Sequence, residues 1–543
     1  MGGVTWDETL DIYGSGKNIE KFKYFIANEE LIEPSTLVAQ YFGQLIKLPI
    51  YVVSQSERAV DLFSMIFETI FQEESSYIEA FFNLRHYLLN VYIFLSIFII
   101  FYLLNKIIHE SKISLLILFF VFWNPIFLGH AMFNLTDIPM AIQIFIASLI
   151  YIDLIVCKEP LKKDFLIVGV FFGLALLTRV SAAAFLLPLG IYYLIVKRKE
   201  KNLIQSIGNH FYTLISAFIV LVLGSPGAFI DPMHYINGLI NAQFTGQDFY
   251  GYLPLNGKMI FSLDWNPEYL LNLFLYKLPI VILIFTLIGL FKLRQIQSHL
   301  FRYSFLFISY TYIAHELFRP SVFNYFRHYL FLIPFFCVIA GFSFCSLIKN
   351  KSQIFQLISF FAIFSYFVLT QFGLEQYKYV YVNEFVDEDL ITIDCSESYE
   401  LNGCGYWQTD YYGFSGKQTI DIVENLNLEN VYICQPSHSY SLYLESNNFW
   451  KINNGNPDFD DYIFWDQYKY IYNIDHFNEF LEINPSGYFY TLNIHSPGYK
   501  TCGLENVSIE FFEIDCKIEE VVTTQLRGSP IYLNYIHYCE YTT

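Results

Sequence analysis

Ten apolar stretches follow one another between residues 87 and 373, and they constrain the fold more than any other feature. Each comes close to the about 20 apolar residues that a helix needs to cross a bilayer. Their succession predicts a polytopic membrane protein with a helical body. We expect helices at residues 87–105, 112–130, 138–156, 164–179, 181–196, 208–227, 270–291, 300–317, 327–346 and 353–372.

Composition supports a membrane protein and excludes one class of partner. The chain is 54% hydrophobic and only 15% charged, whereas soluble domains are about a quarter charged. Beyond residue 373 the sequence becomes polar and turn-rich, and its acidic excess accounts for roughly the whole net charge of −19. Because nucleic-acid binding needs a basic face, we expect no nucleic-acid partner.

These composition shifts divide the chain into three parts. Residues 1–86 form an N-terminal segment, residues 87–373 form the transmembrane body, and residues 374–543 form a C-terminal domain. The last part mixes β-type runs such as YFYTLNI with one helical pattern, TIDIVENLN, which predicts a small α/β domain.

Lysine and arginine residues in the connections predict the orientation. Every second connection is basic, which fits ten unbroken crossings and places those loops in the cytoplasm. The N-terminal segment, the alternate loops and the C-terminal domain then lie outside. The basic residues in or beside these loops are Lys106, Lys112, Lys158, Lys162, Lys163, Lys197, Arg198, Lys199, Lys201, Lys292, Arg294, Arg302, Lys349 and Lys351.

An outer N-terminal segment is normally delivered by a preceding helix, and the sequence MGGVTWDE begins without one. We therefore expect that a first transmembrane helix is missing from this sequence, as in a truncated homologue. The moderately apolar residues 35–53 contain Gln40, Gln44 and Lys47, which favours an interfacial amphipathic helix over a span.

The cysteines agree with this orientation. Cys157, Cys337 and Cys345 lie in or beside apolar stretches, where they act as small apolar residues. An even number of cysteines in the outer domain predicts an oxidising compartment and up to three disulfides, with the pairing left open. The disulfide candidates are Cys395, Cys404, Cys434, Cys502, Cys516 and Cys539.

Several charged residues at the outer ends of the helices need an explanation. Asp137 precedes a span, where it caps the helix, belongs to a site, or does both. Arg85, Arg179 and the Arg327-His328 pair lie on the side where cations are disfavoured. They either extend to lipid headgroups or form an anion site for a phosphate.

An acidic pair, Asp7 and Glu8, lies in the first outer segment, within TWDETLDIYGSG. Acidic residues and outer cations on one side of the membrane indicate a pocket for an acidic group and a lipid phosphate. One carboxylate can deprotonate a nucleophile, and cationic side chains can stabilise a phosphate leaving group.

The ordered motifs resemble the polytopic lipid-dependent glycosyltransferases of the GT-C type, especially the bacterial branch similar to dolichyl-phosphate-mannose protein mannosyltransferases. The similarity covers about residues 5–430, and the expected lack of a first helix would depart from the family pattern. The motifs are WDE, PIFLGHAMFNLTDIPMA, GLALLTRVSAAAFLLPL, SPGAFIDPMHYINGL, DWNPEYLLNLFLYKLPI, RPSVFNYFRHYLFLIPF and YWQTDYYGFSGKQTIDIVENL.

The resemblance implies a GT-C-like body of about ten helices that moves a sugar from a polyprenyl-phosphate donor to a protein, lipid or glycan acceptor. Asp7 matches the catalytic acidic position, as general base or as ligand of a divalent cation (Mg²⁺, Mn²⁺ or Zn²⁺). Glu8 assists it, and Asp137 matches the second acidic position, which places the acceptor or metal. Arg85, Arg179, Arg327 and His328 are expected at the donor phosphate.

The chemistry of such a transfer is consistent with these residue types. Glycosyl transfer passes through an oxocarbenium-like state, and an inverting single displacement needs no covalent sugar–enzyme intermediate. A bacterial inner membrane, with the C-terminal domain outside, is the expected location, and the endoplasmic reticulum membrane is the alternative.

Three other functions stay open from the sequence: a lipid or polysaccharide transporter or flippase, a non-catalytic scaffold, and an inactive truncated homologue. Transporters often carry inverted repeats, which this sequence lacks. A scaffold would not need acidic residues beside a group of arginines.

Overall fold

The structure is a computed structural model of the full chain. Apart from a few isolated residues, the structure describes residues 56–71, 77–156, 161–198, 203–225, 252–256, 258–320, 325–372, 374–386, 431–433, 449–452, 470–471, 486–494, 513–526 and 529–542. The chain divides into two compact units. One is helical and comprises Leu10–Gly251 and Ser262–Phe385, and the other comprises Met1–Thr9, Tyr252–Phe261 and Val386–Thr543.

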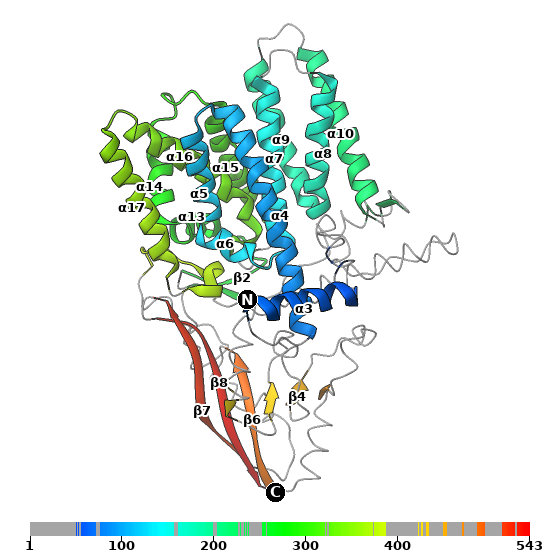
Figure 1. Cartoon of the computed structure of the whole chain (residues 1–543), viewed down its shortest axis with the longest axis vertical. Coiled ribbons are helices and arrows are strands. Elements are labelled where there is room, and N and C mark those ends of the chain that lie inside the picture. The colour runs from blue at the N-terminus through cyan, green and yellow to red at the C-terminus, as the bar shows by residue number, and fades with distance from the viewer. Residues whose placement is uncertain are drawn as a thin grey trace. The chain divides into compact units, whose positions relative to one another are not determined.

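The helical unit is built from helices that pack side by side (Figure 1). The described helices are α3 (Glu57–Phe71), α4 (Tyr77–Ile108), α5 (Ser111–Phe122), α6 (Pro125–Ala131), α7 (Asp137–Val156), α8 (Lys162–Thr178), α9 (Leu186–Lys197), α10 (Leu203–Gly224), α13 (Tyr269–Lys277), α14 (Ile280–Phe291), α15 (His299–Phe318), α16 (Ile333–Ile348) and α17 (Gln353–Gln371), with 3₁₀ helices η2 (Val180–Phe185), η3 (Tyr325–Leu332) and η4 (Glu375–Val380).

Each of the ten predicted apolar stretches contains helix in the structure, so the expected multi-pass helical fold is confirmed. Within the described residues, four helices are long and apolar enough to cross a membrane, and two bent pairs raise this to six if each pair is one span. The four are Asn83–Ile108, Asp137–Val156, Tyr325–Ile348 and Gln353–Gln371.

Two stretches predicted as continuous helices are broken, which corrects the prediction. Residues 112–130 form α5 and α6 with a bend of 66°, and residues 270–291 form α13 and α14 with a bend of 114°. At the first break Asn124 caps α6, because its side chain accepts from the amides of Ile126 and Phe127. Proline follows each break, and it lacks the amide hydrogen that a continuous helix needs.

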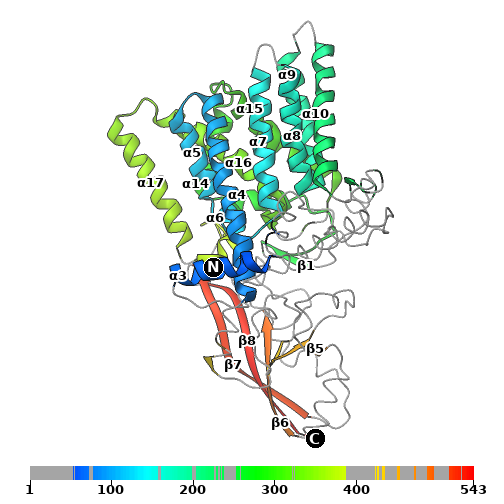
Figure 2. The ribbon, with the colours of Figure 1, turned by 45° about the vertical axis from the view of Figure 1, so that its right-hand side comes forward.

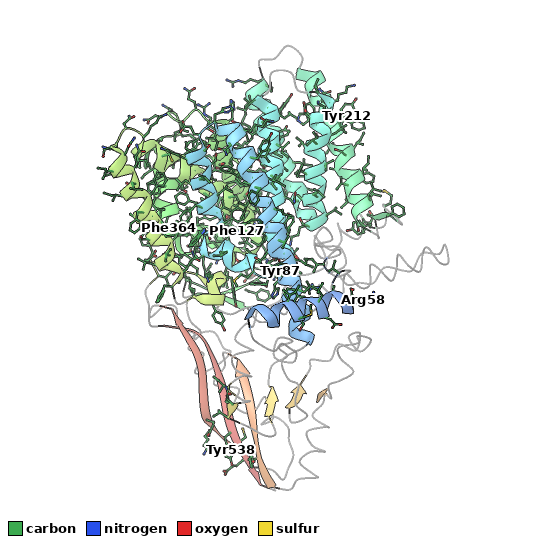
Figure 3. The ribbon with its side chains drawn as sticks, viewed as in Figure 1. Arg58, Tyr87, Phe127, Tyr212, Phe364 and Tyr538 are labelled. Atoms are coloured by element: carbon green, nitrogen blue, oxygen red, sulfur yellow. The ribbon has the colours of Figure 1, made fainter. Side chains whose placement is uncertain are left out.

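Helix α7 is the most enclosed of the four long apolar helices, because 89% of the residues in its apolar part are buried. It packs against α4, α8 and η3, so its first residue lies among elements from distant parts of the sequence. Figure 3 shows the side chains of the described residues, with Phe127 of α6 labelled. Helix α17 is largely exposed, since only 11% of the residues in its apolar part are buried.

Helices α8 and α10 lie side by side in both views (Figures 1 and 2). Glycine makes this close approach possible. A Cβ atom on Gly173 would lie 2.7 Å from the carbonyl oxygen of Ala217, and one on Gly169 would overlap Ser216 and Thr213. Small residues at such spacing let helix backbones approach in membranes.

The segment that leaves the helical unit is buried. Tyr377, Tyr379 and Asn383 are 0–2% exposed. The Asn383 side chain donates to the carbonyl oxygens of Leu275 and Leu278 at 2.6 and 2.8 Å. We call residues 377–383 the exit segment, and its contacts fix it against the break between α13 and α14.

The second unit contains a six-stranded sheet of order β5-β4-β3-β6-β8-β7. The strands are β3 (Val431–Ile433), β4 (Phe449–Ile452), β5 (Tyr470–Ile471), β6 (Ser486–Ile494), β7 (Glu513–Leu526) and β8 (Ser529–Thr542). Strands β3 to β6 pair in parallel, whereas β8 pairs antiparallel with β6 and β7. A separate hairpin joins β1 (Tyr252–Leu255) to β2 (Lys258–Phe261).

Candidate functional site

The site is built on the turn between α6 and α7. Asn134 organises this turn, because its side-chain oxygen accepts from the backbone amides of Thr136 and Asp137 at 3.1 and 2.8 Å. These are the amides at the start of α7, so Asn134 supplies the capping contacts there. The carboxylate of Asp137 is directed elsewhere, to side chains from two other elements.

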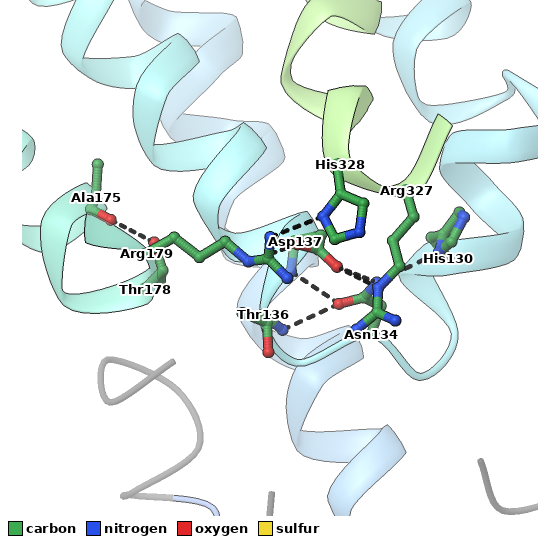
Figure 4. A network of polar contacts seen from close by, with 9 residues as sticks. All are labelled: His130, Asn134, Thr136, Asp137, Ala175, Thr178, Arg179, Arg327 and His328. Carbon is green, nitrogen blue, oxygen red and sulfur yellow. Dashed lines mark hydrogen bonds and ion pairs between the residues drawn. The ribbon is translucent and has the colours of Figure 1, made fainter. Parts of the chain in front are cut away.

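Two arginines pair with Asp137 (Figure 4). Arg179, which follows α8, places its Nε 2.9 Å from Oδ1 of Asp137. Arg327, in η3, donates from Nε to Oδ2 at 3.0 Å. Asn134 also donates to Oδ2, at 2.9 Å. Both carboxylate oxygens are therefore engaged.

Two histidines complete the cluster. Nη1 of Arg179 lies 2.9 Å from Nδ1 of His328. A guanidinium group only donates, so this ring nitrogen accepts and His328 is neutral in this arrangement. His130 contacts Asn134, with its Nδ1 3.3 Å from the side-chain Nδ2 of Asn134. Counting two guanidinium groups and one carboxylate, the cluster of Asp137, Arg179 and Arg327 carries a net positive charge.

Exposure differs between the acid and its two partners. The Asp137 side chain is fully buried, whereas the Arg179 and Arg327 side chains are 19% and 12% exposed. A molecule that approaches the cluster therefore meets cationic groups and not the carboxylate. Such an arrangement suits an anion that arginine can bind through two nitrogens.

Arg85 and His86 lie on α4, which packs against α6 and α7. Their side chains are 0% and 4% exposed, so both are inside the helical unit. Arg85 is among the largest of the fully buried side chains. Burial of an arginine in a membrane body is costly, which favours a role inside the protein over extension to lipid headgroups.

Of the residues proposed from the sequence, Asp137, Arg179, Arg327 and His328 lie together. Asp7 and Glu8 lie outside the described residues, as do Cys395, Cys404, Cys434 and Cys502. Cys539 is disulfide-bonded, and the backbone register places Cys516 opposite it in the neighbouring strand. The predicted interfacial helix at residues 35–53 is almost entirely outside the described part of the chain.

Sequence reasoning assigned no role to Asn134, which orients Asp137. The sequence does contain an indication of this role, because an asparagine three residues before the first residue of a helix is suited to capping it. In the described part of the chain, no three histidine, cysteine, aspartate or glutamate residues are grouped as metal ligands.

The sequence comparison bears on this same part of the chain. Residues 83–227 match the family model described as dolichyl-phosphate-mannose-protein mannosyltransferase. The match includes Arg85, Asp137 and Arg179. It confirms the resemblance seen in the motifs, and with it the expectations of a GT-C type glycosyltransferase and an integral membrane protein.

Among solved structures, the chain is similar to ArnT from Cupriavidus metallidurans. In the apo state the identity is 11% and the TM-score 0.48, with 96% of this chain and 93% of that chain covered. For ArnT bound to undecaprenyl phosphate the identity is 10% and the TM-score 0.45, with 88% and 87% covered. No curated protein matches the sequence significantly.

Proposed function

We propose that this chain transfers a sugar from a polyprenyl-phosphate donor to an acceptor hydroxyl at the outer face of a membrane. The observation that carries the proposal is the buried Asp137 between two partly exposed arginines. The carboxylate holds both guanidinium groups in place before a ligand arrives. Such preorganised cations bind and stabilise a phosphate more effectively than side chains that must first be ordered.

In the proposed reaction, an acceptor hydroxyl attacks the anomeric carbon while the bond from that carbon to the phosphate oxygen breaks. The phosphate leaves with the bonding electrons, and the guanidinium groups of Arg179 and Arg327 stabilise its charge. The hydroxyl proton passes to a carboxylate, for which Asp7 is the proposed acceptor and Glu8 its neighbour. This single displacement inverts the configuration of the sugar.

We assign Asp137 a positioning role in this reaction. Its two oxygens contact Arg179, Arg327 and Asn134, which leaves the carboxylate poorly placed to accept a proton from a substrate. Two adjacent guanidinium groups also disfavour a divalent cation at this carboxylate. The described residues therefore do not fit a metal at Asp137, and the proposed mechanism includes no metal step there.

The setting of the reaction follows from the same proposal. A bacterial inner membrane with the C-terminal unit outside fits the basic connections on the other side. The acceptor is a protein, lipid or glycan with an accessible hydroxyl group.

The direct test measures sugar transfer from radiolabelled polyprenyl-phosphate sugars in membranes that contain the protein. Replacing Arg327 by lysine keeps the charge and removes the planar fork, so transfer should fall about a hundredfold, as when one donor to a developing anion is lost. Arg302→Lys is the matched control, because Arg302 is exposed and lies near the start of α15. It should leave transfer unchanged.

Asp7→Asn separates the chemical step from binding. This variant should lose transfer while it retains its affinity for the donor. Equal transfer by Asp7→Asn and the wild type would remove Asp7 from the mechanism. If the wild type moves labelled lipid across vesicles without transferring sugar, the transferase proposal is wrong and the transporter hypothesis replaces it.

A further inference from the structure

We propose that Lys277 is a positioning residue that holds the segment bearing Arg327 and His328. Its effect on a bound phosphate rests on the proposed function, whereas its effect on the segment does not. Lys277 is the last residue of α13, beside the sharp break before α14. Its side chain is only 1% exposed, although it carries an amine.

The amine of Lys277 joins two distant parts of the chain. Its Nζ donates to the carbonyl oxygen of Val380, in the exit segment, at 3.1 Å. The same atom lies 5.0 Å from the centre of the Tyr325 ring. An ammonium group within about 6 Å of an aromatic ring is attracted to it, most strongly where water is excluded.

The backbone of Tyr325 adopts an unfavourable conformation that neighbouring groups must stabilise. Its φ is 49°, in the left-handed region that non-glycine residues seldom adopt. Such a conformation persists where its surroundings hold it. Tyr269, also in α13, donates from its hydroxyl to the Tyr325 carbonyl oxygen at 3.4 Å. Helix α13 therefore holds Tyr325 at both its ring and its backbone.

Tyr325 is the first residue of η3, and Arg327 follows it two residues later in the same 3₁₀ helix. The left-handed turn at Tyr325 sets the direction in which η3 starts. Arg327 reaches Asp137 from this segment, and His328 reaches Arg179. A small rotation at Tyr325 would move both contacts, because both follow it directly in the chain.

The end of α13 that carries Lys277 is itself held by hydrogen bonds. Asn383 donates to the carbonyl oxygens of Leu275 and Leu278, and its own amide donates to the Tyr276 carbonyl oxygen at 2.8 Å. The carbonyl oxygens of Leu275, Tyr276 and Leu278, which flank Lys277, thus accept hydrogen bonds from the exit segment. Lys277 therefore extends toward Tyr325 from a rigid backbone, which is the condition for positioning another segment.

The first experiment needs no ligand. Hydrogen exchange of residues 325–332 is compared by mass spectrometry for the wild type and Lys277→Met in lipid nanodiscs. Methionine fills a similar volume without the charge, so exchange should be about tenfold faster there, as expected for loss of a desolvated cation–π contact. Lys292→Met is the matched control, because that lysine donates to Ser346 and lies at the other end of α14.

Two further variants distinguish the proposed role of Lys277 from simple misfolding of Lys277→Met. Tyr269→Phe removes the hydrogen bond to Tyr325 and leaves the buried amine in place, so it should also raise exchange in residues 325–332. Lys277→Arg keeps a cation and should restore most of the protection. Unchanged exchange in this segment for both Lys277→Met and Tyr269→Phe would overturn the proposal.

The second experiment measures the Kd for undecaprenyl phosphate. Lys277→Met should raise this Kd about tenfold through misplacement of Arg327, while Lys277→Arg stays close to the wild type. Faster exchange with an unchanged Kd would limit Lys277 to a structural role and contradict its part in binding. If the wild type itself does not bind undecaprenyl phosphate, the proposed function fails, and the exchange result still decides whether Lys277 positions the segment.

Discussion

At the residue scale, Asp137 differs from a typical surface acid because every contact described for its carboxylate is to another buried or partly buried polar group. It pairs with Arg179 and Arg327 and accepts from Asn134. Removal of one member of a buried ion pair leaves uncompensated charge in a medium of low polarity. The residue is therefore expected to matter for stability as well as for ligand binding.

Asp137→Asn should lower the free energy of unfolding by about 3 kcal/mol, because two guanidinium groups lose the carboxylate that both of them contact. Thermal unfolding in detergent micelles measures the change. Asp153→Asn provides a control on the same helix, since Asp153 pairs with Lys106 at a partly exposed site. That substitution should cost less than about 1 kcal/mol. Equal stability of both variants would contradict the structural account of Asp137.

At the element scale, the pairing of α8 with α10 positions Arg179. Helix α8 ends at Thr178, and Arg179 follows immediately. The close approach of the two helices at Gly169 and Gly173 fixes where α8 ends. Any side chain that pushes α8 away from α10 would displace Arg179 from Asp137.

Gly169→Ala tests this packing, because its new Cβ atom would overlap Ser216 and Thr213 of α10. We expect a loss of about 2 kcal/mol in stability, which is typical of overpacking. Gly208→Ala is the matched control, since nothing lies within 4 Å of a Cβ atom at that position of α10. It should be neutral or stabilising. Thermal unfolding of both variants gives the comparison, and a stable Gly169→Ala protein would refute tight packing.

At the scale of the whole molecule, the two units differ in the state of the cysteines that the structure describes. Cys337 and Cys345 of the helical unit are free thiols. Cys539 of the second unit is disulfide-bonded. Disulfides persist in oxidising compartments, so the second unit is expected on the side of the membrane away from the cytoplasm.

Alkylation of the denatured, unreduced protein tests this difference. Cys337 and Cys345 should react with iodoacetamide once unfolding exposes them, whereas Cys539 should react only after a reductant is added. Mass spectrometry of the digested protein reads each site separately. Alkylation of Cys539 without a reductant, in protein purified from native membranes, would contradict the disulfide and the expected location of this unit.

The positions of the helices and several site residues could be predicted from local features of the sequence. Apolar length is a local property, so the ten stretches were visible without any knowledge of packing. Asp137, Arg179 and Arg327 were also visible, because charged residues at the ends of apolar stretches are rare enough to need an explanation. The two helix breaks were the local feature that the prediction missed, although proline follows each of them.

Which of these residues contact one another depends on long-range packing. Arg327 lies 190 residues from Asp137, and His328 lies 149 residues from Arg179. Their pairing depends on how α7, α8 and η3 pack, which no local pattern encodes. The same holds for Lys277, which the sequence shows only as a lysine in an apolar run. Its proposed role arises from the Tyr325 ring and the Val380 carbonyl oxygen, which long-range packing brings to one amine.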